Sequence, residues 1–315
     1  MEDFSGVLCG SKKSGDDIET LISDSEHRRA LKTCIDIPEQ KPSFSLPIND
    51  VGICRKIVWI NLPQGKIPFE TEVKVDLPSS IRGIHMSRIE KAIAELYNKN
   101  FVDIAEYAEH LVKSVQTGQK CSKAFVKLSG RIPMVQKAPA TRISSMDSIQ
   151  ICAIAELIKR KESVCKILTG AGLTHITACP CTQAYNRVLS GKSEGMPLPT
   201  HTQRSITWLT IERDRAKPSY EELILCLKSA LHSTYDLLKR PDEAELVLLA
   251  HNAPQFVEDT ARETAKEVGI RFGDFLPESV FVKIESYSLE SIHNHDVQCS
   301  IKTTMGEILK VITVV

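Results

Sequence analysis

The stretch Arg55-Lys-Ile-Val-Trp-Ile-Asn-Leu62, followed by Phe69-Glu-Thr-Glu-Val-Lys-Val-Asp-Leu77, decides the fold class. Both segments are rich in β-branched and aromatic residues, and apolar residues alternate with charged ones in the second. A short turn around Gly65 separates them, so the sequence predicts a β-hairpin. Two segments with apolar residues at helical spacing follow, Met86–Asn98 and Val102–Gln116. The folded part of the chain therefore begins as strand-strand-helix-helix.

The order strand-strand-helix-helix-strand-strand occurs twice along the sequence. The expected strands are 124–128, 149–157, 164–178, 203–212, 279–289 and 297–309, a loop is expected at 133–145, and helices at 220–239 and 254–268. Strands with helices in this order predict an α+β fold, an antiparallel sheet with helices on one face. We expect an N-terminal extension at 1–50, with a short helix near Ile18–Leu31, a first unit at 51–160 and a second at 161–315.

Composition limits the classes of function. The 315 residues are 42% hydrophobic and 25% charged, as in a soluble globular protein with two cores or one repeated fold. Forty basic residues balance forty acidic ones, so no nucleic acid or membrane partner is expected. The sequence lacks an apolar run of about 18 residues and a signal-peptide pattern, which predicts a cytoplasmic protein. Ten scattered cysteines fit a reducing compartment.

Cys179-Pro-Cys181, with His201 twenty-two residues after Cys179, is a candidate metal centre. A thiolate and an imidazole suit zinc or ferrous iron, and a third protein ligand would leave one coordination position open for water. The alternative is that both cysteines are small buried residues and His201 is an ordinary strand histidine. The spacing is not that of a zinc finger.

Four separated motifs carry a resemblance to a known family. They are Arg82-Gly-Ile-His-Met-Ser-Arg88, Thr177-Ala-Cys-Pro-Cys181, His201-Thr-Gln-Arg-Ser205 and Glu290-Ser-Ile-His-Asn-His295. Together they resemble the metal-dependent GTP cyclohydrolases of the type IB and archaeal methanopterin-pathway branch, from about Val51 to about Thr304. The resemblance implies two tandem tunnelling-fold units whose sheets close into a barrel when subunits assemble into a homodimer or homotetramer.

The resemblance also implies roles for individual residues. Cys179, His201 and Glu243 are the implied ligands of Fe²⁺, with Zn²⁺ or Mn²⁺ as alternatives. The implied proton-transfer residues are His293 and His295, because histidine gives and takes protons near neutral pH. Cys181 is a further candidate for a proton donor. The implied contacts to GTP are Glu258 for the guanine edge and Arg82, His85, Arg88 and Arg204 for the ribose or triphosphate.

Each assignment has an ordinary structural explanation beside it. Glu243 lies in a charged cluster with Asp242 and Glu245 of the kind that begins many helices. Glu258 and Arg204 are also compatible with exposed surface positions, and Cys181 with packing. No Gly-x-x-x-x-Gly-Lys-Ser/Thr loop is present, so GTP is not bound in the P-loop manner.

The expected reaction is hydrolytic opening of the guanine imidazole ring with release of formate. The archaeal branch yields 7,8-dihydroneopterin 2′,3′-cyclic phosphate and pyrophosphate, and the type IB branch yields 7,8-dihydroneopterin triphosphate. The archaeal outcome is favoured by the long chain and by Leu198-Pro-Thr-His-Thr-Gln-Arg204. Two non-enzymatic alternatives remain, a scaffold with a closed four-ligand zinc site and a purine-binding relative that has lost its metal.

Overall fold

The structure is a computed structural model that describes residues 21–159, 163–191 and 198–312. In these residues one antiparallel sheet contains eight strands, and the strands lie side by side in the order in which they occur in the sequence. They are β1 (Ile48–Leu62), β2 (Gly65–Leu77), β3 (Lys123–Lys137), β4 (Ser144–Lys159), β5 (Ser163–Ala178), β6 (Thr202–Glu212), β7 (Phe281–Leu289) and β8 (Val297–Thr304). The helices are α1 (Asp24–Thr33), α2 (Met86–Leu96), α3 (Ile104–Gln119), α4 (Pro180–Ser190), α5 (Tyr220–Ala230), α6 (Arg240–Asn252), α7 (Val257–Phe272) and α8 (Met305–Ile312).

The predicted hairpin is confirmed in β1 and β2. Leu62 pairs with Gly65 across the turn, and Gly65 has a φ of 123°, which only glycine adopts without strain. Along β2 the side chains of Phe69, Thr71, Val73 and Val75 are buried, and the charged side chains that alternate with them are more exposed. One face of the hairpin is therefore committed to a core.

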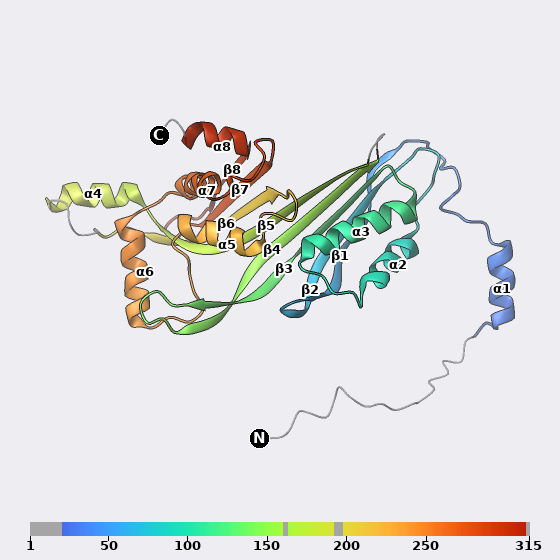
Figure 1. Ribbon diagram of the computed structural model, residues 1–315, viewed down its shortest axis with the longest axis horizontal. Helices are drawn as coiled ribbons and strands as arrows, with labels where there is room; N and C mark the ends of the chain where they lie inside the picture. The colour runs from blue at the N-terminus through green and yellow to red at the C-terminus, as the bar shows by residue number, and fades with distance from the viewer. Residues whose placement is uncertain (1–20, 160–162, 192–197, 313–315) are drawn as a thin grey trace, which may run out of the picture.

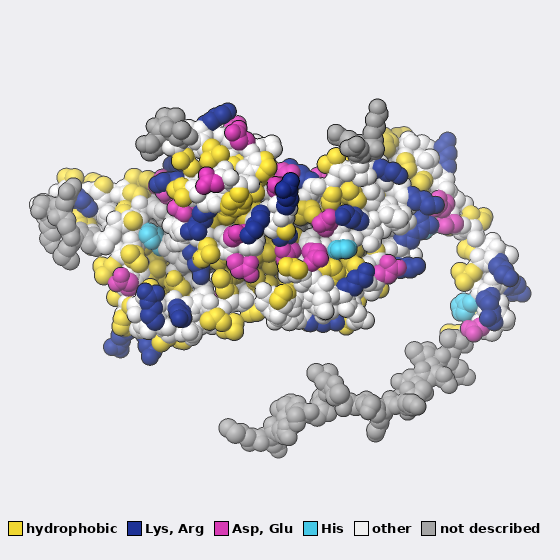
Figure 2. Space-filling view, viewed as in Figure 1, with side chains coloured by type: hydrophobic (Ala, Val, Ile, Leu, Met, Phe, Trp, Pro, Cys, Tyr) yellow, Lys and Arg dark blue, Asp and Glu magenta, His cyan; other side chains and the backbone are white. Residues whose placement is uncertain are grey.

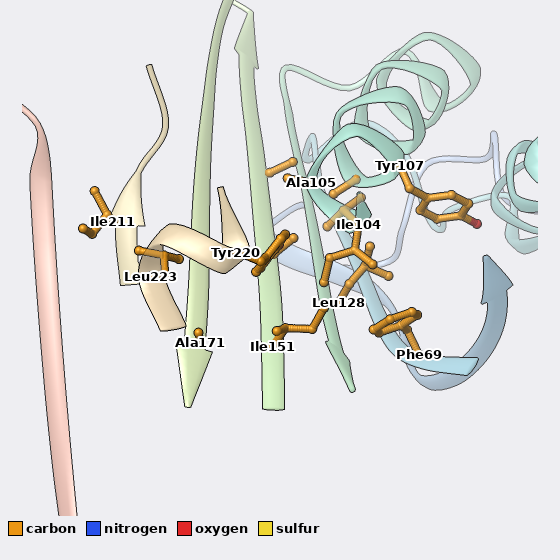
Figure 3. Close-up of a cluster of buried hydrophobic side chains, with 14 of the residues drawn as sticks. Phe69, Ile104, Ala105, Tyr107, Leu128, Ile151, Ala171, Ile211, Tyr220 and Leu223 are labelled. Atoms are coloured by element: carbon orange, nitrogen blue, oxygen red, sulfur yellow. The ribbon is translucent and has the colours of Figure 1, made fainter. Parts of the chain in front are cut away.

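Helices cover that face of the sheet, as an α+β fold requires (Figure 1). α3 packs on β3 and β4, α5 packs on β5, and α7 packs on β7. In the core, Phe69, Leu128 and Ile151 of the sheet lie against Ile104 and the neighbouring side chains of α3 (Figure 3). A fully buried side chain of this size stabilises the fold by about 1.5–3 kcal/mol. The α+β prediction is confirmed, and one apolar cluster runs through both halves of the chain.

The structure differs from the sequence expectation in five places. β3 and β4 extend into the segment expected to be a loop, and neither α4 nor α6 was among the expected helices. The single helix expected at 220–239 ends at Ala230, because the following residues pair with β5 through Ile176 N to His232 O at 3.0 Å. The strand expected at 297–309 ends at Thr304, where α8 begins.

The N-terminal segment lies to one side of the sheet. α1 has a capping box at Ser23 and Glu26 but contributes no buried residue, and Figure 1 shows it away from the other helices. The first residues of the expected helix near Ile18–Leu31, and the expected boundary between units at residue 160, lie outside the described residues.

Charges are mixed on the surface seen in Figure 2, where basic and acidic side chains alternate without a continuous field of one sign. This pattern fits the balanced composition. Within the described ranges, no helix combines the length and the apolar character needed to cross a bilayer.

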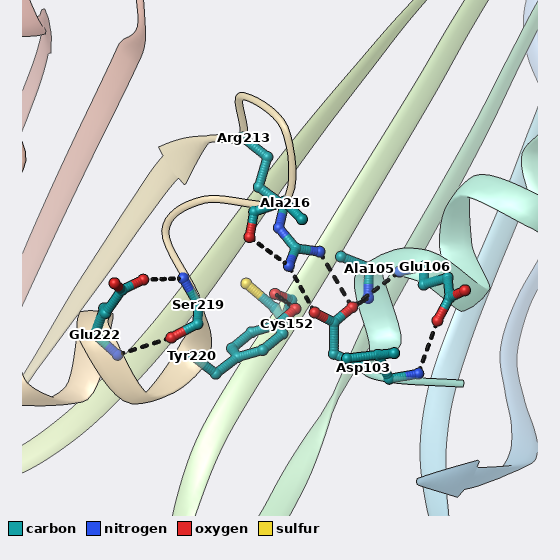
Figure 4. Close-up of polar contacts among 10 residues, drawn as sticks. Asp103, Ala105, Glu106, Cys152, Arg213, Ala216, Ser219, Tyr220 and Glu222 are labelled. Carbon is teal, nitrogen blue, oxygen red and sulfur yellow. Dashed lines mark hydrogen bonds and ion pairs between the residues drawn. The ribbon is translucent and has the colours of Figure 1, made fainter. Parts of the chain in front are cut away.

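A bidentate ion pair joins the two halves of the chain (Figure 4). Arg213, just after β6, donates to the two carboxylate oxygens of Asp103 at 3.1 and 2.6 Å, and to Ala216 O at 3.0 Å. Asp103 also accepts hydrogen bonds from the backbone of Ala105 and Glu106, both at 2.9 Å, and so caps α3. The side chains of Arg213 and Asp103 are only 11% and 16% exposed, so solvent screens the pair weakly.

We expect Arg213→Ala to lower the free energy of unfolding by roughly 3 kcal/mol or more, because Asp103 keeps its buried charge without its partner. Urea unfolding at fixed protein concentration measures this. Arg262→Ala is the matched control: its ion pair with Asp259 is exposed, and the expected loss is below about 1 kcal/mol. Equal urea midpoints for the two variants would contradict the large contribution to stability expected of the Arg213–Asp103 ion pair.

Candidate functional site

The predicted pair Cys179 and His201 comes together at one end of the sheet. Ala178 at the end of β5 pairs with Thr202 at the start of β6, so the residues just beyond them are neighbours. Cys179 N donates to His201 O at 3.1 Å, and Thr200 Oγ1 donates to Cys179 O at 2.7 Å. Both side chains are half-buried. The bend between β5 and α4 is made by Pro180 at the first helical position, where its missing N–H costs nothing.

His201 presents its second ring nitrogen as a potential ligand. Its Nδ1 lies 3.1 Å from Gln203 Oε1 and can donate a hydrogen bond to that oxygen. A ring held in this way leaves Nε2 as the nitrogen that could bind a metal ion.

His293 and His295 lie beside this pair. Leu289 at the end of β7 pairs with Arg204 of β6, so the loop after β7 leaves the sheet at the same end. The rings of His201 and His293 meet edge to face with centroids 6.4 Å apart, and His293 and His295 stack at 5.1 Å. Asp296 holds the loop by accepting from Glu290 N at 3.2 Å and from the Tyr287 hydroxyl.

Glu243 does not join the cluster within one chain. It is exposed on the first turn of α6, whereas α4 contacts the other end of that helix through Gln183 Nε2 and His251 O at 2.7 Å. Eight residues of helix separate Glu243 from His251, which is about 12 Å along the axis. Of all described residues, only Asp36, Glu39 and His85 bring three potential ligand atoms within 4.8 Å of one another.

The carboxylate that is buried at the start of α6 is the neighbouring Asp242. It accepts hydrogen bonds from the backbone of Ala140, Thr141 and Lys239 at 2.8–3.0 Å and from Thr141 Oγ1 at 2.7 Å. Burial alone would raise the pKa of Asp242, but these hydrogen bonds lower it to about 2. Asp242 thus fixes α6 against the tip of the β3–β4 hairpin and leaves Glu243 outside.

Glu258 is exposed on the first turn of α7, a position that allows either contact with a ligand or an ordinary surface role. Val257 beside it is buried, and its carbonyl accepts a hydrogen bond from Cys299 Sγ at 3.3 Å. Burial and then the nearby charge of Glu258 raise the pKa of the Cys299 thiol.

The basic residues expected to contact substrate fall in two different places. Arg204 is exposed on β6 and lines a polar cavity of about 410 Å³ with Arg131 and Tyr235. Arg82, His85 and Arg88 surround the start of α2 in the first half, and α2 and α4 lie at opposite ends of the molecule in Figure 1.

Residues of the N-terminal segment already contact this second group. His85 Nε2 lies 3.0 Å from Glu39 Oε1, and Arg88 lies 3.5 Å from the same oxygen. Arg82 N donates to Pro38 O at 3.0 Å. Sequence reasoning missed Glu39, because the sequence around an acidic residue in the polar N-terminal segment does not indicate which basic side chains it will contact.

Cys181 is exposed at the second position of α4. The structure therefore brings together Cys179 and His201 from the β5–β6 connection with His293 and His295 from the β7–β8 connection, and one chain leaves Glu243 and the residues around α2 apart from them. Sequence reasoning also missed the buried His175, which lies two residues before the motif that begins at Thr177 and carried no signal of its own.

Comparison with known proteins identifies the family. Residues 34–299 match the type I GTP cyclohydrolase FolE2 family, so the match begins within the segment expected to be an extension. The chain is 33% identical over 305 residues to the GTP cyclohydrolase MptA of Methanococcus vannielii, covering 87% of this chain and 97% of that protein. It is 29% identical to GTP cyclohydrolase MptA 1 of Methanocella arvoryzae, covering 87% and 95%.

A solved structure supports the fold. A uricase from Bacillus fastidious matches with a TM-score of 0.50 at 8% identity, covering 84% of this chain and 96% of that one. At this identity the similarity concerns the fold alone. The sequence match covers most of the chain, and the chain belongs to the type I GTP cyclohydrolase FolE2 family.

Proposed function

We propose that the protein is a metal-dependent GTP cyclohydrolase that opens the guanine imidazole ring and releases formate. The observation that carries the proposal is the meeting of Cys179, His201, His293 and His295 at one end of the sheet in a chain of this family. These four side chains provide two metal ligands and two groups that can move protons.

The donor set fits a divalent metal. Cys179 would supply its sulfur and His201 its Nε2, and we propose Fe²⁺ as the ion, with Zn²⁺ or Mn²⁺ as alternatives. Such an ion would supply Lewis acidity and lower the pKa of water towards about 7. Glu243 would be the third ligand only through a shift of α6 or from a second copy of the chain.

The remaining residues bind GTP and move its protons. Glu258 accepts hydrogen bonds from the ring N–H and the amino group of guanine, because a carboxylate offers two acceptors to that edge. His293 and His295 give protons to the ring nitrogens as the imidazole ring opens, and Cys181 is a further proton donor. Arg204 contacts the ribose or the phosphates.

Oligomerisation would complete this site. We infer two tandem tunnelling-fold units, 51–160 and 161–315, whose sheets close into a barrel in a homodimer or homotetramer. The separation of Arg82, His85 and Arg88 from Cys179 within one chain supports this inference, since a second copy can bring them to the substrate.

We expect purification in air to give mostly zinc or too little metal and low activity, because the affinity order favours zinc over iron. Anaerobic reconstitution with Fe²⁺ should restore turnover of GTP to formate, pyrophosphate and 7,8-dihydroneopterin 2′,3′-cyclic phosphate. Phosphorus NMR measures the products. A pterin that keeps its triphosphate would assign the type IB reaction instead, and no pterin with Fe²⁺ would contradict the enzymatic proposal.

A structural zinc scaffold is the competing proposal. It needs a closed group of four ligands that includes Cys181, yet no three of Cys179, Cys181, His201, His293 and His295 bring ligand atoms within 4.8 Å of one another. Within one chain these side chains therefore do not form the closed site that a structural zinc ion needs, and a three-ligand catalytic set would also need Glu243 or a second copy of the chain.

A further inference from the structure

A row of buried polar side chains crosses the sheet beneath α7. His175 Nε2 on β5 lies 2.9 Å from Thr207 Oγ1 on β6, which lies 2.7 Å from Ser286 Oγ on β7. Ser286 Oγ lies 3.0 Å from Thr260 Oγ1 on α7. All four side chains are at most 1% exposed. The row has no access to solvent and serves no step described above.

The row ends next to the residue proposed to hold guanine. Thr260 Oγ1 lies 2.7 Å from the carbonyl of Val257, and Glu258 is the next residue along the chain. The same carbonyl accepts the Cys299 thiol at 3.3 Å. Strands β5, β6 and β7 are thus connected by hydrogen bonds to the first turn of α7.

Thr260 is the donor at the α7 end of the row. Its hydroxyl donates to the Val257 carbonyl at 2.7 Å and to Ser286 Oγ at 3.0 Å. The contacts among His175, Thr207 and Ser286 allow donation in either direction, because a hydroxyl can both donate and accept. Burial lowers the pKa of His175 to about 3, so the ring is neutral at pH 7.

We propose that His175, Thr207, Ser286 and Thr260 are positioning residues that set the height and rotation of the first turn of α7, and through it the recognition of guanine by Glu258. This inference rests on the proposed function. Polar networks that are fully hydrogen-bonded favour one arrangement over others, whereas an apolar contact would let the helix slide. The purine preference of the enzyme therefore depends on hydroxyl groups that never touch the substrate.

Thr207→Val tests the proposal, because valine keeps the shape and removes both hydrogen bonds. We measure dissociation constants of the metal-loaded protein for GTP and for ITP, which lacks the 2-amino group. The Kd for GTP should rise about tenfold, as expected for losing one well-placed hydrogen-bonding group. The Kd for ITP should rise less, because ITP uses only part of the Glu258 carboxylate.

Three other variants make the test specific. Thr169→Val removes a buried hydroxyl that has no partner among the described residues, and it should leave both constants unchanged. Thr207→Ser keeps the hydroxyl and should restore the GTP preference. Glu258→Gln should remove that preference, which checks the anchor itself.

The outcomes separate the two proposals. Loss of preference in Thr207→Val, with metal content matching Thr169→Val and the preference restored in Thr207→Ser, supports positioning through the row. Equal weakening of GTP and ITP binding, or none, overturns it. Wild-type protein that prefers GTP over ITP but forms no pterin contradicts the proposed reaction only, since the binding preference still tests the row.

Discussion

Cys179→Ala yields a folded protein that holds almost no metal and releases almost no formate from GTP; this is the largest effect we expect. Alanine cannot replace the thiolate, and losing a direct ligand should weaken metal binding by more than the roughly 10–100-fold seen when an outer partner of a ligand is lost. His201→Ala should behave in the same way, since the two residues are held together by the hydrogen bond from Cys179 N to His201 O.

Metal analysis and formate release under metal-limited conditions measure the effect. Cys54→Ala is the matched control, because Cys54 is exposed on β1 in the first half of the chain and should leave both quantities unchanged. Full activity of Cys179→Ala at limiting metal would remove Cys179 from the set of ligands.

His293→Asn and His295→Asn should slow ring opening by about two to four orders of magnitude, the usual range for losing a general acid or base. Asparagine is polar and of similar size, but it cannot take up and return a proton near neutral pH. Metal content and GTP affinity should stay close to those of the unaltered protein, because neither side chain is proposed as a ligand.

Single-turnover formate release, together with metal analysis, separates chemistry from binding. His27→Asn, on α1 away from the sheet, serves as the control with unchanged rate. Loss of metal from His293→Asn would instead make that histidine a ligand, which its ring contact with His201 allows geometrically.

Local sequence patterns correctly predicted those helices and strands whose boundaries depend on residues nearby in the sequence. Alternation in Phe69–Leu77 and helical spacing in Val102–Gln116 each report a face that will be buried, and both segments formed as expected. The break after Ala230 was not predictable in this way. It arises because Thr234 N donates to Thr174 O at 3.1 Å, a partner 60 residues away.

In the candidate site, too, local motifs were predictable and contacts between distant segments were not. Cys179 and His201 were predicted from motifs, and the register of β5 with β6 explains why they meet. The position of Glu243 depends on how Asp242 fastens α6 to the β3–β4 hairpin, which is a tertiary contact with no local signature. The pairing of Glu39 with His85 is of the same kind.

The order of the strands matters while the chain is being synthesised. Each strand pairs with the one made just before it, so the sheet can grow strand by strand as the polypeptide leaves the ribosome. Side-chain contacts do not follow this order: Asp103 must wait for Arg213, a partner 110 residues later, roughly 10 s at ordinary rates of translation. During that time the half-sheet would expose the edge of β4, but β5 begins only four residues after β4 ends and covers it first.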